Sequence, residues 1–408
     1  MTQHRKPVGV ASPALAGPLG FAVGGRLPWA SGLSPRLAIL ATAFLLPAPG
    51  PAVAASIEDF DRLWSKATLY RGEGAAWVRE LRLIGREQID WYDFSDGQAR
   101  HEGFANRRTR LGVEVLFAQQ GQFRLEVDWA ARAGAFHYNK LTDCYFKQEW
   151  AGGWALTVGK QSTRITLDGA TPANQLITIE RSALAWNLGV PEDSVPGLNL
   201  ERNLGPWYYR VGLFSAGVAS PGFGDFSAAP IGIVSIARDL APAGSGDHAV
   251  VRLDAFLQGD DAANATGRPG AFTRDHEQVW SLNARLDHGP WALGVDLATS
   301  TGRRAQADLK GVQFMPSYAF DASWQVVYRF TWLASGQPDG VRFTRYENQV
   351  NLGRGDRYQE HYFGLNRYFY GHKLKWMLGA QHTTMLDAAG NGGAYRGWGL
   401  SSGFRVWW

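Results

Sequence analysis

Residues 395–408 read YRGWGLSSGFRVWW, and this stretch decides the fold that we expect. From Trp398 to Trp408 every second residue lies on one mostly apolar face, whereas the residues between them, including Arg405, form the other face. A period of two predicts a β-strand, because successive side chains of a strand point to opposite sides. A membrane barrel needs such an aromatic-ended strand to close its edge. We therefore expect an all-β protein, a transmembrane antiparallel β-barrel.

The same alternation recurs along the chain. In residues 121–130 (GQFRLEVDWA) four apolar side chains alternate with Arg124, Glu126 and Asp128. Similar patterns lie in residues 107–118, 248–259, 276–287 and 372–383. One such strand would suit a half-exposed sheet in water. Repeated around a whole chain, the pattern predicts lipid on the outside and a polar lumen on the inside.

We expect about 16 strands, joined alternately by tight turns and by long polar loops such as those at 259–275 and 334–358. The expected strands are 77–84, 86–93, 107–118, 121–130, 139–151, 153–163, 207–217, 231–240, 248–259, 276–287, 291–302, 309–320, 324–335, 358–370, 372–383 and 395–408. Residues 343–352 are an alternative strand that would replace one of the first two.

One interruption, residues 164–206, is much longer than the others. A segment of about 40 residues without regular structure is usually functional in a compact fold. In a barrel of this size its natural place is inside the lumen. We therefore expect an inward-folded loop that narrows a pore.

Composition agrees with a barrel and excludes other classes. The chain of 408 residues has 49 Gly, 17 Trp, 14 Tyr and 21 Phe, which suits glycine-rich strands and aromatic girdles. With Cys144 as the one cysteine, neither an intramolecular disulfide nor a cysteine-based zinc site can form. The histidines lack H-x-x-x-H and H-E-x-x-H spacing, so we expect no metal and no cofactor.

The first residues are typical of an export signal. A basic start is followed by the apolar run LAILATAFLL at 37–46 and by an A-x-A pattern at 52–54, which predicts a signal peptide over 1–54. The alternative, a membrane-anchor helix, would need about twice that apolar length. Residues 55–76 are expected to form a short periplasmic segment, and Ser56 before apolar residues at helical spacing favours a helix there. The barrel would then span 77–408.

The net charge of +4 comes from the leader. Residues 1–54 hold four of the 41 basic residues and no acidic residue, so the remainder has 37 basic and 37 acidic side chains. A nucleic-acid partner therefore has no electrostatic support.

Several short motifs resemble the phosphate-selective porin O and P family. They are RRTRLGVE at 107–114, LTVGK at 156–160, IERS at 179–182, YFGLNRYF at 362–369, GHKLK at 371–375 and the terminal aromatic residue. The resemblance implies a trimeric porin of the bacterial outer membrane with sixteen strands and an inward loop, which passes anions such as phosphate along lumen arginines and lysines. By resemblance to outer-membrane proteins in general, Trp408 would be recognised by the barrel-assembly machinery.

An anion sheds water only where fixed positive charge or N–H donors replace that water, and the arginine fork suits phosphate oxygens. The candidate pore-lining and anion-binding residues are Lys160, Arg164, Arg181, Arg210, Arg110, Arg124, Arg252 and Arg285. For each of them the competing interpretation is a solvated wall residue paired with a carboxylate. Arg181 is favoured because it lies in a family motif inside the long interruption. Carboxylates such as Glu180 and Glu201 depart from a purely basic lining.

We expect a passive channel rather than an enzyme, with outer-membrane lipid and small anionic or polar solutes as partners. The alternatives are a barrel hydrolase or protease, and a structural or adhesive barrel without a pore. The sequence GLSSG at 399–403 matches the G-x-S-x-G nucleophile pattern, but that pattern has meaning at a strand-to-helix turn, and here it lies inside an expected strand.

Overall fold

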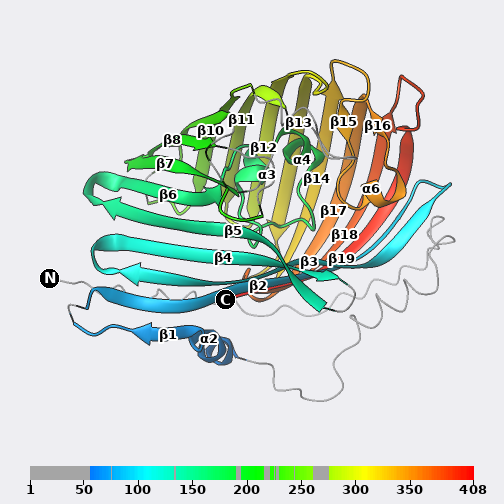
Figure 1. The fold of residues 1–408 in the computed structure, drawn as a ribbon. Coiled ribbons are helices and arrows are strands. Elements are labelled where there is room, and N and C mark those ends of the chain that lie inside the picture. Colours follow the sequence, from blue (N-terminus) through cyan, green and yellow to red (C-terminus); the bar gives the residue numbers. More distant parts are fainter. Residues whose placement is uncertain are drawn as a thin grey trace, which may run out of the picture. The chain divides into compact units, whose positions relative to one another are not determined.

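The computed structural model describes residues 56–74, 76–132, 135–189, 194–215, 221–224, 226, 229–242, 244–260 and 275–408. The expected signal peptide, residues 1–54, lies outside these ranges. Within them, antiparallel strands form a closed barrel, which Figure 1 shows from the side. No helix among the described residues is long and apolar enough to cross a bilayer.

The barrel wall has 16 strands among the described residues, each paired antiparallel with the next. They are β2 (Val78–Ser95), β3 (Arg100–Phe117), β4 (Gly121–Arg132), β5 (Ala135–Trp150), β6 (Trp154–Ser162), β7 (Ser194–Leu204), β8 (Trp207–Ser215), β9 (Pro230–Asp239), β10 (His248–Gln258), β11 (His276–His288), β12 (Trp291–Gly302), β13 (Leu309–Ala319), β14 (Trp324–Ser335), β17 (Arg357–Tyr370), β18 (Leu374–Leu386) and β19 (Tyr395–Trp407).

The last strand closes the barrel, as the opening stretch predicts. β19 pairs antiparallel with β2, from Trp398 opposite Ser95 to Trp407 opposite Arg86. Beyond the strand, the backbone N–H of Trp408 donates to the oxygen of Gly85 over 3.1 Å, and the N–H of Gly85 donates back over 3.2 Å. The backbone is thus paired along the seam from Trp398 to Trp408, as a wall in lipid requires.

Two errors in the expected strands cancel in the total. Residues 77–84 and 86–93 are one strand, β2, because Gly85 continues the pairing with β3 instead of forming a turn. The expected long loop ends early, since residues 194–204 form β7, although Pro196 and Gly197 weaken its strand pattern. The alternative strand at 343–352 is wrong: this stretch contains the short helix α6 (Glu347–Val350).

Alternation along the strands separates an outer from an inner face. On β19, for example, Phe404 is 43 % exposed whereas the neighbouring Arg405 is 4 % exposed. Outward apolar side chains such as Val211, Leu213 and Phe363 are exposed over more than half of their surface. The buried arginines and carboxylates face the lumen. The outer face is therefore apolar where lipid would cover it.

The segment after β6 and a second loop fold into the barrel. Residues 163–189, which we call the lumen segment, contain the short helices α3 (Leu167–Ala170) and α4 (Ala183–Leu188). Figure 1 shows both helices inside the ring of strands. The loop between β14 and β17 contains α6 and a small hairpin of β15 (Val341–Arg342) and β16 (Arg354–Gly355).

An apolar cluster holds α4 against one side of the barrel. Ala183, Leu184 and Leu188 are fully buried and pack with inward-facing side chains of the wall. These are Phe214, Ile231, Ile233, Phe256, Val279, Ala298, Leu309 and Leu333, from β8 to β14. Because this half of the lumen is filled, the cavities lie mostly toward β2 to β8, and Arg252 of β10 reaches one of them.

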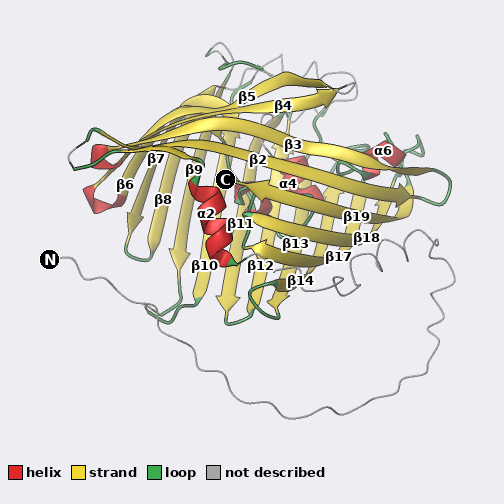
Figure 2. Ribbon diagram, turned by 90° about the horizontal axis from the view of Figure 1, so that it is seen from below, coloured by secondary structure: helices red, strands yellow, loops and turns green. Residues whose placement is uncertain are grey.

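The segment before the barrel is attached at its seam. α2 (Ile57–Ser65) begins with a capping box between Ser56 and Asp59. The short strand β1 (Thr68–Arg71) pairs antiparallel with residues 80–82, near the start of β2. The indole Nε1 of Trp64 donates to the backbone oxygen of Trp407 over 2.6 Å. Figure 2 shows α2 next to the C-terminus of the chain. The helix expected in this segment is present; its periplasmic location stays an expectation.

Glycine is required at position 112, where the backbone of β4 lies close to β3. A Cβ atom there would lie 2.0 Å from the backbone oxygen of Leu125. We expect Gly112→Ala to destabilise the barrel by about 1–3 kcal/mol, the usual cost of overpacking. The midpoint of heat-induced unfolding, followed by the mobility shift of unboiled protein in SDS gels, should fall.

Gly232→Ala is the matched control, because the nearest atom to a Cβ at position 232 lies 4.0 Å away. Its unfolding midpoint should match that of the wild type. Equal midpoints for the two variants would contradict the close approach of β3 and β4.

Candidate functional site

The lumen segment is held by cationic and amide side chains of the wall that donate to its main-chain oxygens. The Lys375 amine donates to the oxygen of Leu176 over 2.5 Å. The Asn366 amide donates to the oxygen of Ile177 over 2.9 Å, and Arg405 donates to the oxygen of Ile179 over 3.3 Å. A buried segment without regular structure must satisfy its carbonyl groups in this way.

Arg329 on β14 is the central anchor and is almost fully buried. Its Nε and Nη2 donate to the two oxygens of Glu360 over 2.8 and 3.2 Å. Its Nη1 donates to Thr178 Oγ1 over 3.1 Å and to the backbone oxygen of Glu180 over 2.8 Å. Asp168 of α3 lies 3.6 Å from the same nitrogen. One guanidinium therefore joins β14, β17 and two parts of the lumen segment.

The two short helices are tied down by carboxylates. Asp296 of β12 accepts the N–H of Leu167 over 2.7 Å, at the start of α3. Asp168 accepts the N–H of Ser182 over 2.9 Å, at the start of α4. Carboxylates at these positions satisfy N–H groups that a helix start leaves without partners.

β3, on another side of the barrel, contacts the segment through an ion pair. Arg107 of β3 binds both carboxylate oxygens of Glu180, one of them over 3.1 Å. Burial alone would raise the pKa of Glu180, but the Arg107 guanidinium lowers it to about 2. Glu180 therefore stays ionised at neutral pH, and the pair holds the segment opposite β3.

A β-bulge directs two consecutive arginines into the lumen. Gln88 of β2 pairs with Arg108, whereas the next residue, Ile89, pairs with Asn106, so that Arg107 is the extra residue of β3. A bulge re-aims side chains that strict alternation would send to opposite faces. Both Arg107 and Arg108 consequently line the same cavity.

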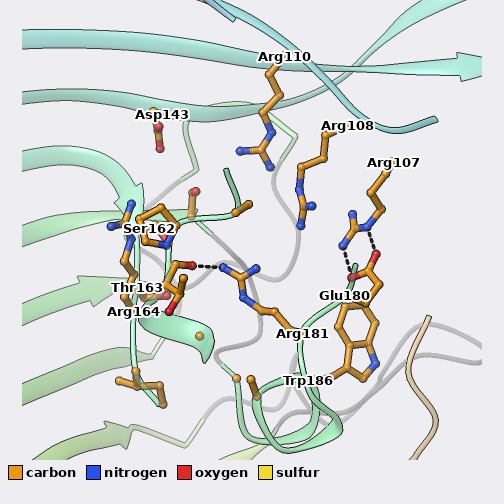
Figure 3. Close-up of a pocket in the computed structure, with 18 of the residues that line it drawn as sticks. Arg107, Arg108, Arg110, Asp143, Ser162, Thr163, Arg164, Glu180, Arg181 and Trp186 are labelled. Atoms are coloured by element: carbon orange, nitrogen blue, oxygen red, sulfur yellow. Dashed lines mark hydrogen bonds and ion pairs between the residues drawn. The ribbon is translucent and has the colours of Figure 1, made fainter. Parts of the chain in front are cut away.

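This first cavity lies between the lumen segment and the wall. Figure 3 shows Arg107, Arg108 and Arg110 extending from β3 toward Arg164 and Arg181. Six arginines line the cavity, the sixth being Arg86, whereas its carboxylates are Asp143 and Glu180. Trp186 and Ile165 add apolar contacts at its edge. The lining therefore carries an excess of positive charge.

The six arginines differ in how far they are neutralised. Arg86 and Arg110 both contact Glu126, each over 3.1 Å. Arg108 donates to the amide oxygen of Gln88 over 2.8 Å. Neither Arg108 nor Arg164 lies within ion-pair distance of a carboxylate in the ranges that the structure describes. These two guanidinium groups are thus the ones best able to exchange water for an anion.

A second cavity continues from the first toward the end of the barrel where the turns are short. The two cavities share Arg86, Asp143, Ser162, Arg164 and Pro172. The basic side chains of the second cavity are Arg86, Arg124, Lys147, Arg164, Arg210 and Arg252. Arg210 donates to the oxygens of Asn199 and Arg164, each over 2.6 Å. Basic side chains therefore follow the polar side of the lumen past the segment.

The candidate residues from the sequence fall into two groups. Three line the first cavity and four line the second, with Arg164 common to both: Arg110, Arg164 and Arg181, and Arg124, Arg164, Arg210 and Arg252. Lys160 and Arg285 line neither cavity. The Lys160 amine donates to the oxygen of Gly222 over 2.5 Å, and Arg285 is exposed and paired with Asp287 over 2.8 Å.

Sequence reasoning missed Arg86, Arg107 and Arg108. Arg86 was hidden because Gly85 suggested a turn, and the bulge removed the alternation that would have marked Arg107. The run RRTR at 107–110 was the available signal, since four polar residues in succession are unusual for a strand in lipid.

A closed barrel with apolar outer and charged inner faces, narrowed by a segment folded into its lumen, defines an outer-membrane porin. The model of the phosphate-selective porin O and P family matches residues 81–388. The chain belongs to this family, and its location is the bacterial outer membrane. No curated protein sequence matches the chain.

Solved structures share the fold at low sequence identity. OprB of Pseudomonas putida has 13 % identity and a TM-score of 0.58, and the alignment covers 80 % of this chain and 94 % of OprB. An anion-selective porin from Comamonas acidovorans has 12 % identity and a TM-score of 0.54, over 80 % and 99 % of the two chains. OmpT of Vibrio cholerae, with a loop deleted, has 11 % identity and a TM-score of 0.54, over 80 % and 99 %.

The anchor at Arg329 generates a prediction about the pore. We expect Arg329→Ala to release the lumen segment, because Thr178 and the Glu180 carbonyl lose their donor and Glu360 is left without its cation. The single-channel conductance in planar bilayers should rise, and the current through the open channel should fluctuate more.

Arg285→Ala is the control, since Arg285 is exposed and lines neither cavity. Its conductance should equal that of the wild type. An unchanged conductance in a folded Arg329→Ala barrel would contradict the role of Arg329 as the central anchor of the segment.

Proposed function

We propose that this porin is a passive channel that favours small anions over cations. The observation that carries the proposal is the first cavity, where six arginines face the carboxylates of Asp143 and Glu180 beside the lumen segment. Fixed positive charge in a narrow lumen attracts anions and repels cations before they reach the constriction. The anion-selective porin from Comamonas acidovorans has the same fold, which is compatible with this selectivity.

Phosphate is the anion that we propose for the first cavity. Arg108 and Arg164 present donors that no carboxylate occupies among the described residues, and a planar guanidinium binds two phosphate oxygens at once. The family to which the chain belongs has phosphate-selective members by its description.

The reversal potential in asymmetric potassium chloride tests this function. The double variant Arg108→Gln, Arg164→Gln should lower the ratio of chloride to potassium permeability by roughly an order of magnitude, the scale of concentration effects in charged clefts. Added phosphate should block chloride current in the wild type and much less in this variant.

Arg285→Gln removes a positive charge outside both cavities and should keep the wild-type ratio and the phosphate block. A wild-type channel that prefers potassium would overturn the proposal. An equal loss in Arg285→Gln would mean that net charge, and not this cavity, sets selectivity.

A barrel hydrolase is less well supported. Ser401 and Ser402 of the GLSSG stretch lie inside β19, in register with Gly379 and Leu378 of β18, and not at a strand-to-helix turn. The Ser402 hydroxyl accepts the indole N–H of Trp376 over 2.8 Å. These contacts are those of wall residues.

We also propose that three copies of the chain associate through the outer wall of β2 and β3. Glu87 lies on the outward face, where its Oε2 accepts the Thr109 hydroxyl over 2.6 Å. Its Oε1 is buried and has no partner among the described residues, and the same holds for the indole nitrogen of Trp129 opposite Thr109. A carboxylate on a lipid-facing surface is costly, and a second copy of the chain over β2 and β3 would shield Glu87 from lipid.

The mass of the protein in detergent tests this association. Sedimentation with correction for bound detergent should give three chains per particle, and Glu87→Arg should lower that number because a long cation would replace the acceptor. A particle of one chain in the wild type would contradict the proposal. Recognition of Trp408 by the assembly machinery and cleavage of residues 1–54 stay predictions.

A further inference from the structure

The second cavity combines two kinds of side chain. Its basic residues suit the acidic group of a solute, as in the first cavity. It is also lined by neutral side chains that donate or accept hydrogen bonds: Thr157, Gln161, Asn174, Gln175, Asn199 and Tyr208. A bare inorganic anion needs the basic residues, but it has little use for amides and hydroxyls on every side.

Two carboxylates lie along the same path. Asp143 lines both cavities, and Glu201 lines the second, where its Oε1 accepts the hydroxyl of Tyr208 over 2.6 Å. A carboxylate repels chloride and phosphate, and it therefore works against an anion path. The same carboxylate accepts hydrogen bonds from hydroxyl groups of a solute, which a simple anion offers in small number or not at all.

The two cavities are continuous. Arg86 and Arg164 line both, so an acidic group held by either one would leave the rest of the solute in contact with the second cavity. Asn199 and Tyr208 come from neighbouring strands, β7 and β8, and line the wall of this cavity together with Arg210. The path thus has room, and hydrogen-bonding side chains, for a solute larger than a single inorganic ion.

From this arrangement we infer that the preferred solutes are hydroxylated organic anions, with one acidic group and several hydroxyl groups, such as sugar acids or sugar phosphates. The inference rests on the proposed anion channel and names its solute class. Arg164, which lines both cavities, binds the acidic group, while Asn199, Tyr208 and Glu201 bind hydroxyls. Glu201 then has a role as an acceptor.

Gluconate and hexanoate form a matched pair of probes, because they have equal numbers of carbon atoms and one carboxylate each and differ in their hydroxyl groups. The measurement is the block of chloride current through single wild-type channels in planar bilayers. Gluconate should block at a concentration about two to ten times lower than hexanoate, the effect of one net hydrogen bond. Glucose phosphate against butyl phosphate repeats the comparison with a phosphate as the acidic group.

Two variants remove one hydroxyl each at nearly constant shape: Tyr208→Phe and Thr157→Val. Both should weaken the block by gluconate and leave the block by hexanoate unchanged. Tyr209→Phe is the matched control, since Tyr209 follows on the same strand but faces outward, opposite Ile236. It should behave as the wild type with both probes. The two variants act independently, so a folding defect in one leaves the other as a test.

The outcomes separate the inference from the function on which it rests. An anion-selective channel that binds gluconate no better than hexanoate would overturn the inference and leave the proposed function intact. Equal loss of gluconate block in Tyr209→Phe would also overturn it. A channel without preference for chloride over potassium would overturn both.

Discussion

The structure depends on the attraction between buried cations of the barrel wall and the main-chain oxygens of the lumen segment. Arg329, Lys375 and Arg405 each donate to a carbonyl of residues 176–180. Buried cations are costly unless they are paired and fully hydrogen-bonded. Glu360 supplies the opposite charge for Arg329 and Asp90 that for Arg405, and carbonyl groups of the segment accept further N–H groups of both arginines. The segment and the wall therefore satisfy each other's polar groups.

The apolar filling of the lumen by α4 lies on one side, which determines where solutes would pass. The apolar side chains of α4 fill the lumen along β8 to β14. Tyr346, from the loop with α6, packs instead against β2, where its hydroxyl donates to Asp90 over 2.5 Å. The opposite side, toward β2 to β8, retains the arginine-rich cavities. A solute would thus move along a wall of fixed charge, with Arg86 and Arg164 at the point where the two cavities meet.

The fold was accessible from the sequence because a period of two and the placement of long loops are local properties. Strand boundaries were less accessible: Gly85 resembles a turn residue, and Pro196 resembles a loop residue, although both lie in strands. Alternation places Arg110, Arg124 and Arg252 on the lumen side, and in the structure these three side chains line the cavities. The period of two is unbroken around each of them within its own strand.

The site itself was less predictable, for physical reasons. Whether an arginine is neutralised depends on carboxylates from other strands: Glu126 of β4 contacts Arg86 of β2 and Arg110 of β3, which are 40 and 16 residues away in sequence. The bulge at Arg107 depends on the register of β2 against β3. Lys160 has the right parity but reaches the Gly222 carbonyl and not the cavities. Such pairings follow from the closed barrel, and no local pattern contains them.

The most direct measurement is the location of anions inside the lumen. Crystals of the wild-type porin soaked in bromide and, separately, in rubidium allow each ion to be found by its anomalous scattering. The account predicts bromide in the first cavity, within contact of Arg108, Arg164 or Arg181, and no rubidium there. Rubidium in that cavity, or bromide distributed elsewhere in the lumen and not beside these arginines, would contradict it.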